Sequence, residues 1–283
     1  MLPLRRDPPG NPLWESREDR RAEHLRGDSL LSLKSQDDRH HHRQYVLHPL
    51  EPADLPRTNP PTPSVFGYEL ANVRLLADNL AKKNFHVVIP DLFKGDALPI
   101  DFLQSVEPKL SERPNLTLVD KATKTATVGT TLPPWLMKHS EAVSKPLLET
   151  FLKDLRAAEP SIKKLGALGF CWGGRYAVLL AGTPQVDAAF ASHPALVSVP
   201  GDFEPVTRPL GLAVGDQDSL LSVEQVEKIK AAMEGKSTPF ECRVYKDQVH
   251  GFALRGDHSS EEDAKAMDQA EGQVVEWFGK YLS

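Results

Sequence analysis

Glycines on both sides of Cys171 give the segment GFCWGG, at 169–174, the residue types and spacing of a nucleophile elbow. The apolar run 165–168 before it predicts a buried strand, and the apolar run 175–181 after it predicts a buried helix. So sharp a strand-to-helix turn strains the nucleophile's backbone and leaves no room for Cβ atoms beside it. Glycines at the flanking positions meet both requirements. The helix N-terminus would lower the thiol pKa and offer donors to an oxyanion. The alternative is an inert core cysteine in a glycine-rich turn.

Downstream of Cys171, Asp218 and His250 occupy positions suited to the acid and the base of a catalytic triad. Asp218 follows an apolar run, 209–214, that predicts a strand, and His250 follows an alternating run, 240–245, that predicts the next strand. The order Cys171, Asp218, His250 is the order that an α/β-hydrolase requires. Singly, such an aspartate is more often a turn residue and a lone histidine more often solvated or in the core. Their joint placement on successive strand ends favours a triad.

Three segments resemble the signature sequences of the dienelactone hydrolase family, most closely its fungal branch. They are 169–174, 215–218 and 250–253, and the segments 65–69, 72–78 and 88–93 resemble that branch as well. The resemblance covers residues 65–283. It implies an α/β-hydrolase fold, no cofactor, and hydrolysis of lactones or related esters through a thiolate. It also implies that Cys171 is the nucleophile, His250 the base, and Asp218, in preference to Asp216 on the same loop, the residue that orients the base.

The remaining candidate residues would bind the substrate and the oxyanion. One oxyanion donor is expected from the backbone N–H of Trp172, the residue after the nucleophile. The resemblance places the second donor at Val65, in a loop that follows an earlier strand. Arg255 is a candidate clamp for a substrate carboxylate, with a solvated arginine beside Asp257 as the alternative. Tyr68 and Trp172 are candidates for lining the acyl pocket, although aromatic core packing is the commoner role of such residues.

The rest of the chain predicts helices alternating with strands, which favours an α/β fold with a mostly parallel sheet covered on both faces. Helices are expected over 69–83, 143–155, 225–233 and 261–281, and further strands over 86–89 and 186–191. The stretch 95–138 contains five prolines and is expected to be an irregular lid or cap over the site. His193 follows a predicted strand and is expected to border the pocket, without acting as a second base.

Composition sets the broad class of the protein. The chain has 283 residues, 40% of them hydrophobic, and a formal net charge of −5, which suits a globular domain and argues against nucleic-acid binding. Two cysteines make no disulfide framework, so a reducing, cytoplasmic compartment is expected, with Cys242 inert in mid-strand. There is no membrane-spanning apolar run and no signal-peptide stretch. The expected partner is a small ester or lactone, without nucleic acid, membrane or metal, and the oligomeric state stays open.

The segment 1–63 differs from the rest of the chain. It holds ten of the 24 prolines and many alternating charges, so we expect it to be disordered or atypical, and the hydrolase domain to span 64–283. The run 44–47 predicts a short strand that Pro49 soon ends. The three histidines at 40–42 are interpreted as local composition rather than as a metal site. Nothing else before Val65 predicts a strand, which leaves open whether the early strands of the sheet are present.

These observations support three functions. The first is hydrolysis of a small, dienelactone-like ester by a Cys-His-Asp triad. The second is a non-catalytic member of the family that binds a small molecule or a protein through the retained pocket. The third is a redox-responsive protein with Cys171 as its sensor thiol. The intact triad order favours the enzyme, although we interpret the N-terminus as an altered or alternatively spliced form, which leaves the activity of this form open.

Overall fold

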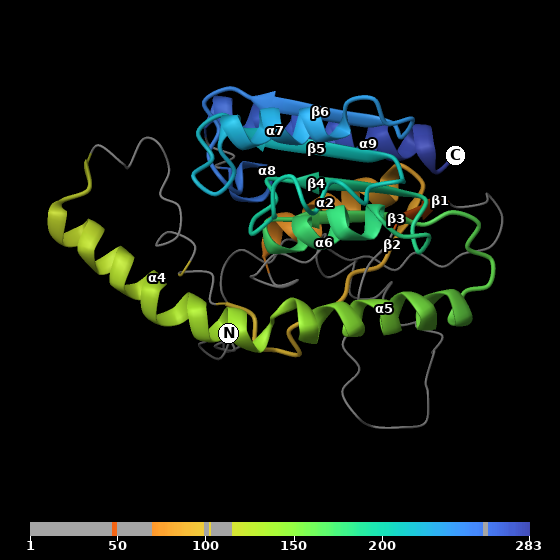
Figure 1. Ribbon diagram of the computed structural model, residues 1–283, viewed down its shortest axis with the longest axis horizontal. Coiled ribbons are helices and arrows are strands. Elements are labelled where there is room, and N and C mark those ends of the chain that lie inside the picture. The colour runs from red at the N-terminus through yellow and green to blue at the C-terminus, as the bar shows by residue number, and fades with distance from the viewer. Residues whose placement is uncertain (1–46, 50–69, 99–101, 103–114, 257–259) are drawn as a thin grey trace, which may run out of the picture. The chain divides into compact units, whose positions relative to one another are not determined.

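The core of the protein is one sheet whose strands come from both ends of the described chain. The computed structural model describes residues 47–49, 70–98, 102, 115–256 and 260–283, all within one compact unit, His42–Ser283. The strands are β1 (Leu47–Pro49), β2 (Phe85–Val87), β3 (Gly166–Phe170), β4 (Ala188–Ser192), β5 (Leu210–Gly215) and β6 (Phe240–Tyr245). Their order in the sheet is β2-β1-β3-β4-β5-β6 (Figure 1). Strands β3 to β6 are parallel and β1 is antiparallel to both neighbours, so the prediction of a mostly parallel sheet is confirmed.

Helices cover both faces of this sheet, as predicted. They are α2 (Ala71–Lys82), α4 (Leu118–Lys138), α5 (Glu141–Ala158), α6 (Trp172–Ala181), α7 (Val223–Met233), α8 (Phe252–Arg255) and α9 (Glu261–Tyr281). Alternate residues of a strand point to opposite faces. Ala167 and Leu212 therefore pack in the cluster formed with α5, α6 and α7, whereas Leu168 and Phe190 pack in the cluster formed with α2 and α9.

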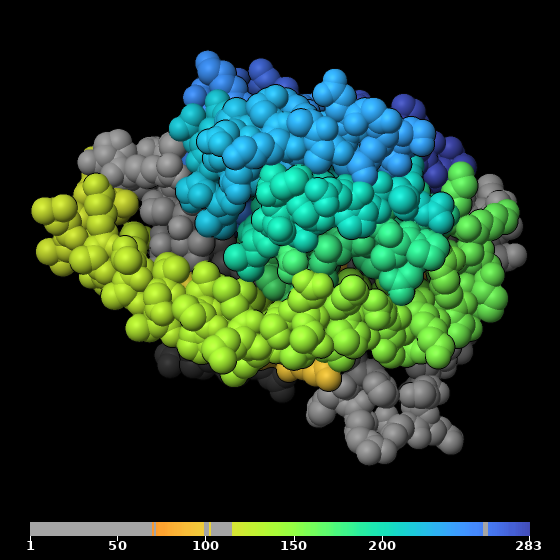
Figure 2. Space-filling model, in the orientation of Figure 1, coloured from red at the N-terminus to blue at the C-terminus, as the bar shows by residue number. Residues whose placement is uncertain are grey.

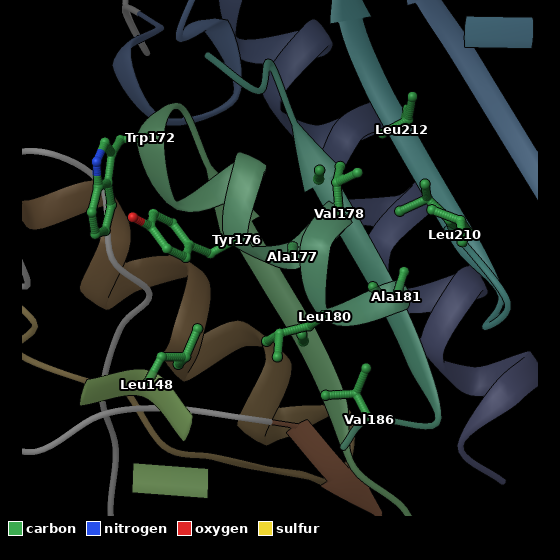
Figure 3. Packing of buried hydrophobic residues seen from close by; sticks show 14 of the residues in the cluster. Leu148, Trp172, Tyr176, Ala177, Val178, Leu180, Ala181, Val186, Leu210 and Leu212 are labelled. Carbon is green, nitrogen blue, oxygen red and sulfur yellow. The ribbon is translucent and has the colours of Figure 1, made fainter. Parts of the chain in front are cut away.

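The first of these two clusters holds α6 against the strands behind the nucleophile turn. Figure 3 shows Tyr176 and Leu180 of α6 between Leu148 of α5 and the strands, with Leu210 of β5 on the far side. These side chains are at most 8% exposed, and burying each one stabilises the fold by about 1.5–3 kcal/mol. The start of α6 is thereby fixed relative to the ends of β3 and β4.

Strand β1 occupies an interior place that the sequence did not indicate. It lies within the segment 1–63, overlaps the run 44–47 only at Leu47, and pairs with β2 through three residues and with β3 at Gly166. Pro49, which was expected to follow the strand and end it, is the last residue of the strand itself. Apart from these three residues, segment 1–63 lies outside the described part of the chain, as do Val65 and Tyr68.

The expectation of an irregular stretch over 95–138 is wrong for its second half, because α4 is continuous from Leu118 to Lys138. Its start is fixed by a capping box, in which Thr117 and Asp120 each accept the other's backbone N–H. Pro133 and Pro134 lie inside the helix, and its last turn is anchored by Trp135, which donates from Nε1 to the carbonyl of Asp96 at 2.7 Å. Figure 2 shows α4 in yellow leading into α5 in green along this face.

Candidate active site

The turn between β3 and α6 places Cys171 at the carboxyl end of the central strand. Its φ of 52° lies in the left-handed region, which non-glycine residues seldom adopt. A Cβ at Gly169 would collide with the carbonyl of Gly173, so the close approach of strand and helix requires glycine there. The amide of Cys171 donates to the carbonyl of Ser192 at 3.2 Å, and its carbonyl accepts from Ala195 at 2.9 Å. The elbow is thus tied to the end of β4.

The loops after β5 and β6 bring Asp218 and His250 together. Nδ1 of His250 lies 3.1 Å from Oδ1 and 3.0 Å from Oδ2 of Asp218, and both side chains are buried. Oδ1 of Asp218 also accepts the backbone N–H groups of Leu220, at 2.8 Å, and Leu221, at 3.0 Å, which fix the carboxylate and offset the cost of burying its charge. The buried Oδ1 of Asp216, by contrast, has no hydrogen-bond partner among the described residues. The structure therefore places Asp218, not Asp216, against the histidine.

The electrostatics of Cys171 favour its thiolate. Burial raises the thiol pKa, but the charges of His250 and Arg255 and the backbone N–H of Trp172 outweigh burial, and the net effect is a lowered pKa. The N–H of Trp172 is the first of the helix donors that the elbow aims at the sulfur. The same N–H would be the first hydrogen-bond donor to an oxyanion.

The pKa of His250 moves in the opposite direction. Burial lowers it, but the negative charge of Cys171 and the hydrogen bond and charge of Asp218 together raise it to about 9. The shared proton is therefore held on the imidazole rather than on the thiol, as in a thiolate–imidazolium pair. Nε2 of His250, on the ring edge away from Asp218, is buried. The hydrogen bond between the side chains of His250 and Cys171 also raises the pKa of the imidazole and lowers that of the thiol.

Arg255 lies closer to the triad than a solvated arginine would. Its guanidinium folds back on the short helix α8 and donates to the carbonyl of His250. Gly251 permits this arrangement, because its φ is +87° and a Cβ there would meet the guanidinium. The alternative partner, Asp257, lies outside the described residues. The charge of Arg255 also acts on Cys171 and on Asp218.

The side chain of Trp172 packs in the core and is 3% exposed. Its ring lies 4.3 Å from that of Tyr176 (Figure 3) and 5.0 Å from that of Phe93, and Trp135 of α4 completes the cluster at 6.1 Å. The backbone of Trp172, rather than its ring, is therefore the part that faces the nucleophile. The cluster also joins the end of α4 to the elbow, a link that the sequence did not reveal because its aromatic residues lie far apart along the chain.

His193 is the residue whose place the sequence indicated least well. It follows β4 and is 1% exposed, and its ring centroid lies 5.2 Å from that of His250 at an interplanar angle of 74°. The only sequence signal was its position after a predicted strand.

The second oxyanion donor, Val65, and the pocket residue Tyr68 lie outside the described residues. Within the described chain, no three His, Cys, Asp or Glu side chains are grouped as metal ligands. None of its helices combines the length and apolar character needed to cross a membrane.

Comparison with known proteins assigns the chain to a family. The sequence profile of the dienelactone hydrolase family matches residues 62–282. The chain belongs to that family. It is therefore a hydrolase of the kind that cleaves esters and lactones, and the resemblance seen in the sequence is confirmed.

Individual relatives agree with this assignment. The chain is 28% identical to the hydrolase pyvD of Aspergillus violaceofuscus, over 77% of this chain and 78% of that one. It is 25% identical to the carboxymethylenebutenolidase homolog of Mus musculus, over 86% and 89% of the two chains. Among solved structures, a dienelactone hydrolase-like promiscuous phosphotriesterase from metagenomic libraries covers 84% of this chain and 98% of its own, with a TM-score of 0.55 and 20% identity. That likeness supports the α/β-hydrolase fold of this family.

Proposed function

We propose that this dienelactone hydrolase family member cleaves a small, dienelactone-like ester or lactone with Cys171 as nucleophile, His250 as base and acid, and Asp218 as the residue that orients the base. The observation that carries the proposal is the opposite displacement of two neighbouring pKa values, lowered at Cys171 and raised to about 9 at His250. Groups whose environments push their pKa values apart in this way are typical of acid and base pairs in catalysis.

Acylation begins with attack of the Cys171 thiolate on the ester carbonyl carbon. The new S–C bond forms as the carbonyl electron pair moves to oxygen, where the N–H of Trp172 and, we propose, that of Val65 stabilise the charge. The oxyanion then collapses and expels the alkoxide, which takes the proton held on Nε2 of His250. The product of this half-reaction is a thioester on Cys171, and in a lactone the released hydroxyl stays attached to the acyl chain.

Deacylation reverses the proton flow. His250, now neutral, takes a proton from a water molecule as its oxygen attacks the thioester carbonyl. Collapse of the second tetrahedral intermediate expels the thiolate and leaves a carboxylic acid, which releases its own proton. The thiolate–imidazolium pair is then restored. Asp218 keeps Nδ1 occupied throughout and so presents Nε2 to the reaction.

The substrate-binding part of the proposal rests on Arg255 and Tyr68. The guanidinium of Arg255 lies beside the triad, where it would attract a substrate that carries a carboxylate as well as the ester. Tyr68 would line the acyl pocket. A small anionic ester or enol lactone is the substrate class that satisfies both residues, and no cofactor takes part in the proposed steps.

The proposal also includes the organisation and setting of the protein. We assign catalysis to 64–283, with 1–63 as an atypical segment that supplies strand β1 to the sheet. We place the protein in the cytoplasm, with no nucleic acid or membrane as partner. Two free cysteines support a reducing compartment. Limited proteolysis of the whole chain tests the division, because early cleavage is expected on the N-terminal side of β1, and early cleavage throughout 64–283 would contradict it.

The decisive experiment measures hydrolysis of a dienelactone and of an activated aryl ester by the parent chain and by Cys171→Ala. Cys242→Ala is the matched control, because it removes a second half-buried thiol from a strand far along the chain. Turnover by the parent and the control but not by Cys171→Ala is expected. A folded parent that hydrolyses neither ester would contradict the proposal, and rapid peroxide modification of Cys171 in that inert protein would favour the redox-responsive alternative.

A further inference from the structure

His193 lies next to the proposed base, with its ring in contact with that of His250. It directly follows β4, beside the elbow of Cys171, and its φ of 38° is in the left-handed region. Its amide donates to the carbonyl of Ala213 in β5 at 2.6 Å, which fixes the backbone at this angle. A strained, buried position at a strand end is the kind of place in which the surrounding fold determines one side-chain direction.

The ring of His193 is held by three other rings. His250 lies 5.2 Å away at 74°, Phe252 lies 5.8 Å away at 67°, and Phe170 lies 5.7 Å away at 48°, all between centroids. The contacts with His250 and Phe252 are edge-to-face and that with Phe170 is tilted, and edge-to-face contacts are favourable and depend on orientation. The imidazole of His250 is therefore held by Asp218 at its Nδ1 edge and by His193 across the ring contact.

Both ring nitrogens of His193 are buried, and neither has a hydrogen-bond partner in another described residue. Burying a polar atom without a partner costs about 1–3 kcal/mol, whereas a phenyl ring of similar shape would not incur this cost. Such an atom calls for an explanation. Packing alone would be better served by Phe, so the nitrogens point to a role in the site.

The charges around His193 keep it neutral. Burial and the positive charges of His250 and Arg255 hold its pKa well below the usual range. The negative groups of the site, the thiolate of Cys171 and the carboxylate of Asp218, act on His250 and Arg255. Of the two histidines in contact, only His250 carries the proton.

We propose that His193 is a positioning residue for His250, an uncharged imidazole that fixes the ring of the base and stabilises its protonated form. A neutral imidazole has a dipole and a lone pair that a phenyl ring lacks. A neutral imidazole can adopt the tautomer whose lone pair faces His250, and that tautomer is favoured when His250 is charged. His193 thereby helps to keep the proton on His250 and the negative charge on Cys171. This inference rests on the proposed triad.

The test compares His193→Phe and His193→Leu with the parent chain. His193→Phe keeps a ring and removes the nitrogens, and His193→Leu removes the ring as well. His86→Phe is the matched control, since it makes the same substitution at a half-buried histidine of β2 that pairs with Glu159, 3.3 Å away. The readouts are the melting temperature, the thiolate absorbance as a function of pH, the NMR titration of His250, and the pH dependence of kcat and KM.

We expect His193→Phe to melt at the same or a higher temperature and to release the His250 proton at lower pH. Its kcat near pH 9 should fall about fivefold with KM unchanged, because a one-unit drop from a pKa of about 9 leaves about a tenth of the essential acid protonated there instead of half. His193→Leu should lose more activity, because the base is no longer held. His86→Phe should follow the parent in kcat and in the titration of His250.

A titration of His250 in His193→Phe that superimposes on that of the parent would overturn the inference, whatever the change in melting temperature. The titrations do not need turnover, so the two failures are distinguishable. If the parent shows no thiolate at neutral pH, the proposed triad fails. If the parent shows the thiolate and both His193 variants leave its titration unchanged, only the role of His193 fails.

Discussion

The two cysteines of this chain are both half-buried and both free, yet their thiols are displaced in opposite directions. Burial raises the pKa of Cys242 to about 11, and the nearby Glu227 and Glu241 add to this against a single opposing lysine, Lys230. Burial also opposes ionisation at Cys171, but His250, Arg255 and a helix N-terminus reverse the outcome. Burial by itself raises the pKa of a thiol and so leaves it unreactive, as at Cys242. The positive groups that the fold brings to Cys171 are what make it reactive.

Removing each thiol in turn is the strongest test of this comparison. Cys171→Ala should lower kcat for an activated ester at least about 10³-fold, because the covalent intermediate can no longer form. Cys242→Ala should stay within a factor of about two of the parent, since an inert thiol contributes only packing. Steady-state kinetics measure both. Equal losses in the two variants would show that the reactive thiol has been misidentified.

Selective alkylation measures the same contrast without any substrate. At neutral pH iodoacetamide should modify Cys171 at least about 10²-fold faster than Cys242, because the thiolate is the reacting form and a thiol with a pKa of about 11 is almost wholly protonated. Peptide mass spectrometry after timed quenching gives both rates. Comparable rates in the folded protein would contradict the assigned environments.

Asp218→Asn should lower kcat by about 10²-fold or more at neutral pH, because the amide no longer stabilises the imidazolium and Cys171 returns toward an ordinary thiol. Asp216→Asn is the matched control, on the same loop but without a contact to His250, and should retain the parent rate. The thiolate absorbance of each variant shows whether activity is lost because Cys171 is no longer ionised. The assignment of Asp218 would be wrong if the two variants lost activity equally.

The pH dependence of kcat should follow the thiolate–imidazolium pair. The lowered pKa of Cys171 lets the nucleophile ionise at lower pH than an ordinary thiol, and kcat should fall as acid protonates it. On the alkaline side, His250 loses its proton as pH rises through about 9, and kcat should then fall about tenfold per unit. A rate that keeps rising with pH beyond 10 would indicate that no imidazolium takes part.

Arg255→Met should have the smallest effect on a neutral ester, about fivefold in kcat/KM at neutral pH, because one of the two positive charges that act on the thiolate is lost. An ester that carries a carboxylate should lose more, mainly through a higher KM, since its clamp is removed. Kinetics with a matched pair of neutral and anionic esters separate the two roles. Identical losses for both esters would remove Arg255 from substrate binding.

Local patterns in the sequence determined much of the fold. The helix expected at 261–281 and the strand expected at 240–245 have the bounds of α9 and β6, because their apolar spacing and flanking residues act over short distances. The glycines around Cys171 likewise predicted the strand, turn and helix of the elbow. The order of Cys171, Asp218 and His250 along the chain followed from the same local signals.

Only the tertiary structure decided which of these residues meet. The pairing of Leu47–Pro49 between β2 and β3 depends on partners more than 35 residues away along the chain, so no local pattern reveals it. The packing of Trp135 that holds the end of α4 is equally non-local. The contacts of His250 with Asp218 and with His193 are non-local too, although the family resemblance had already favoured Asp218 over Asp216. The sequence by itself supplied the reactive groups, and their opposite pKa displacements arise from distances between charges that only the folded chain sets.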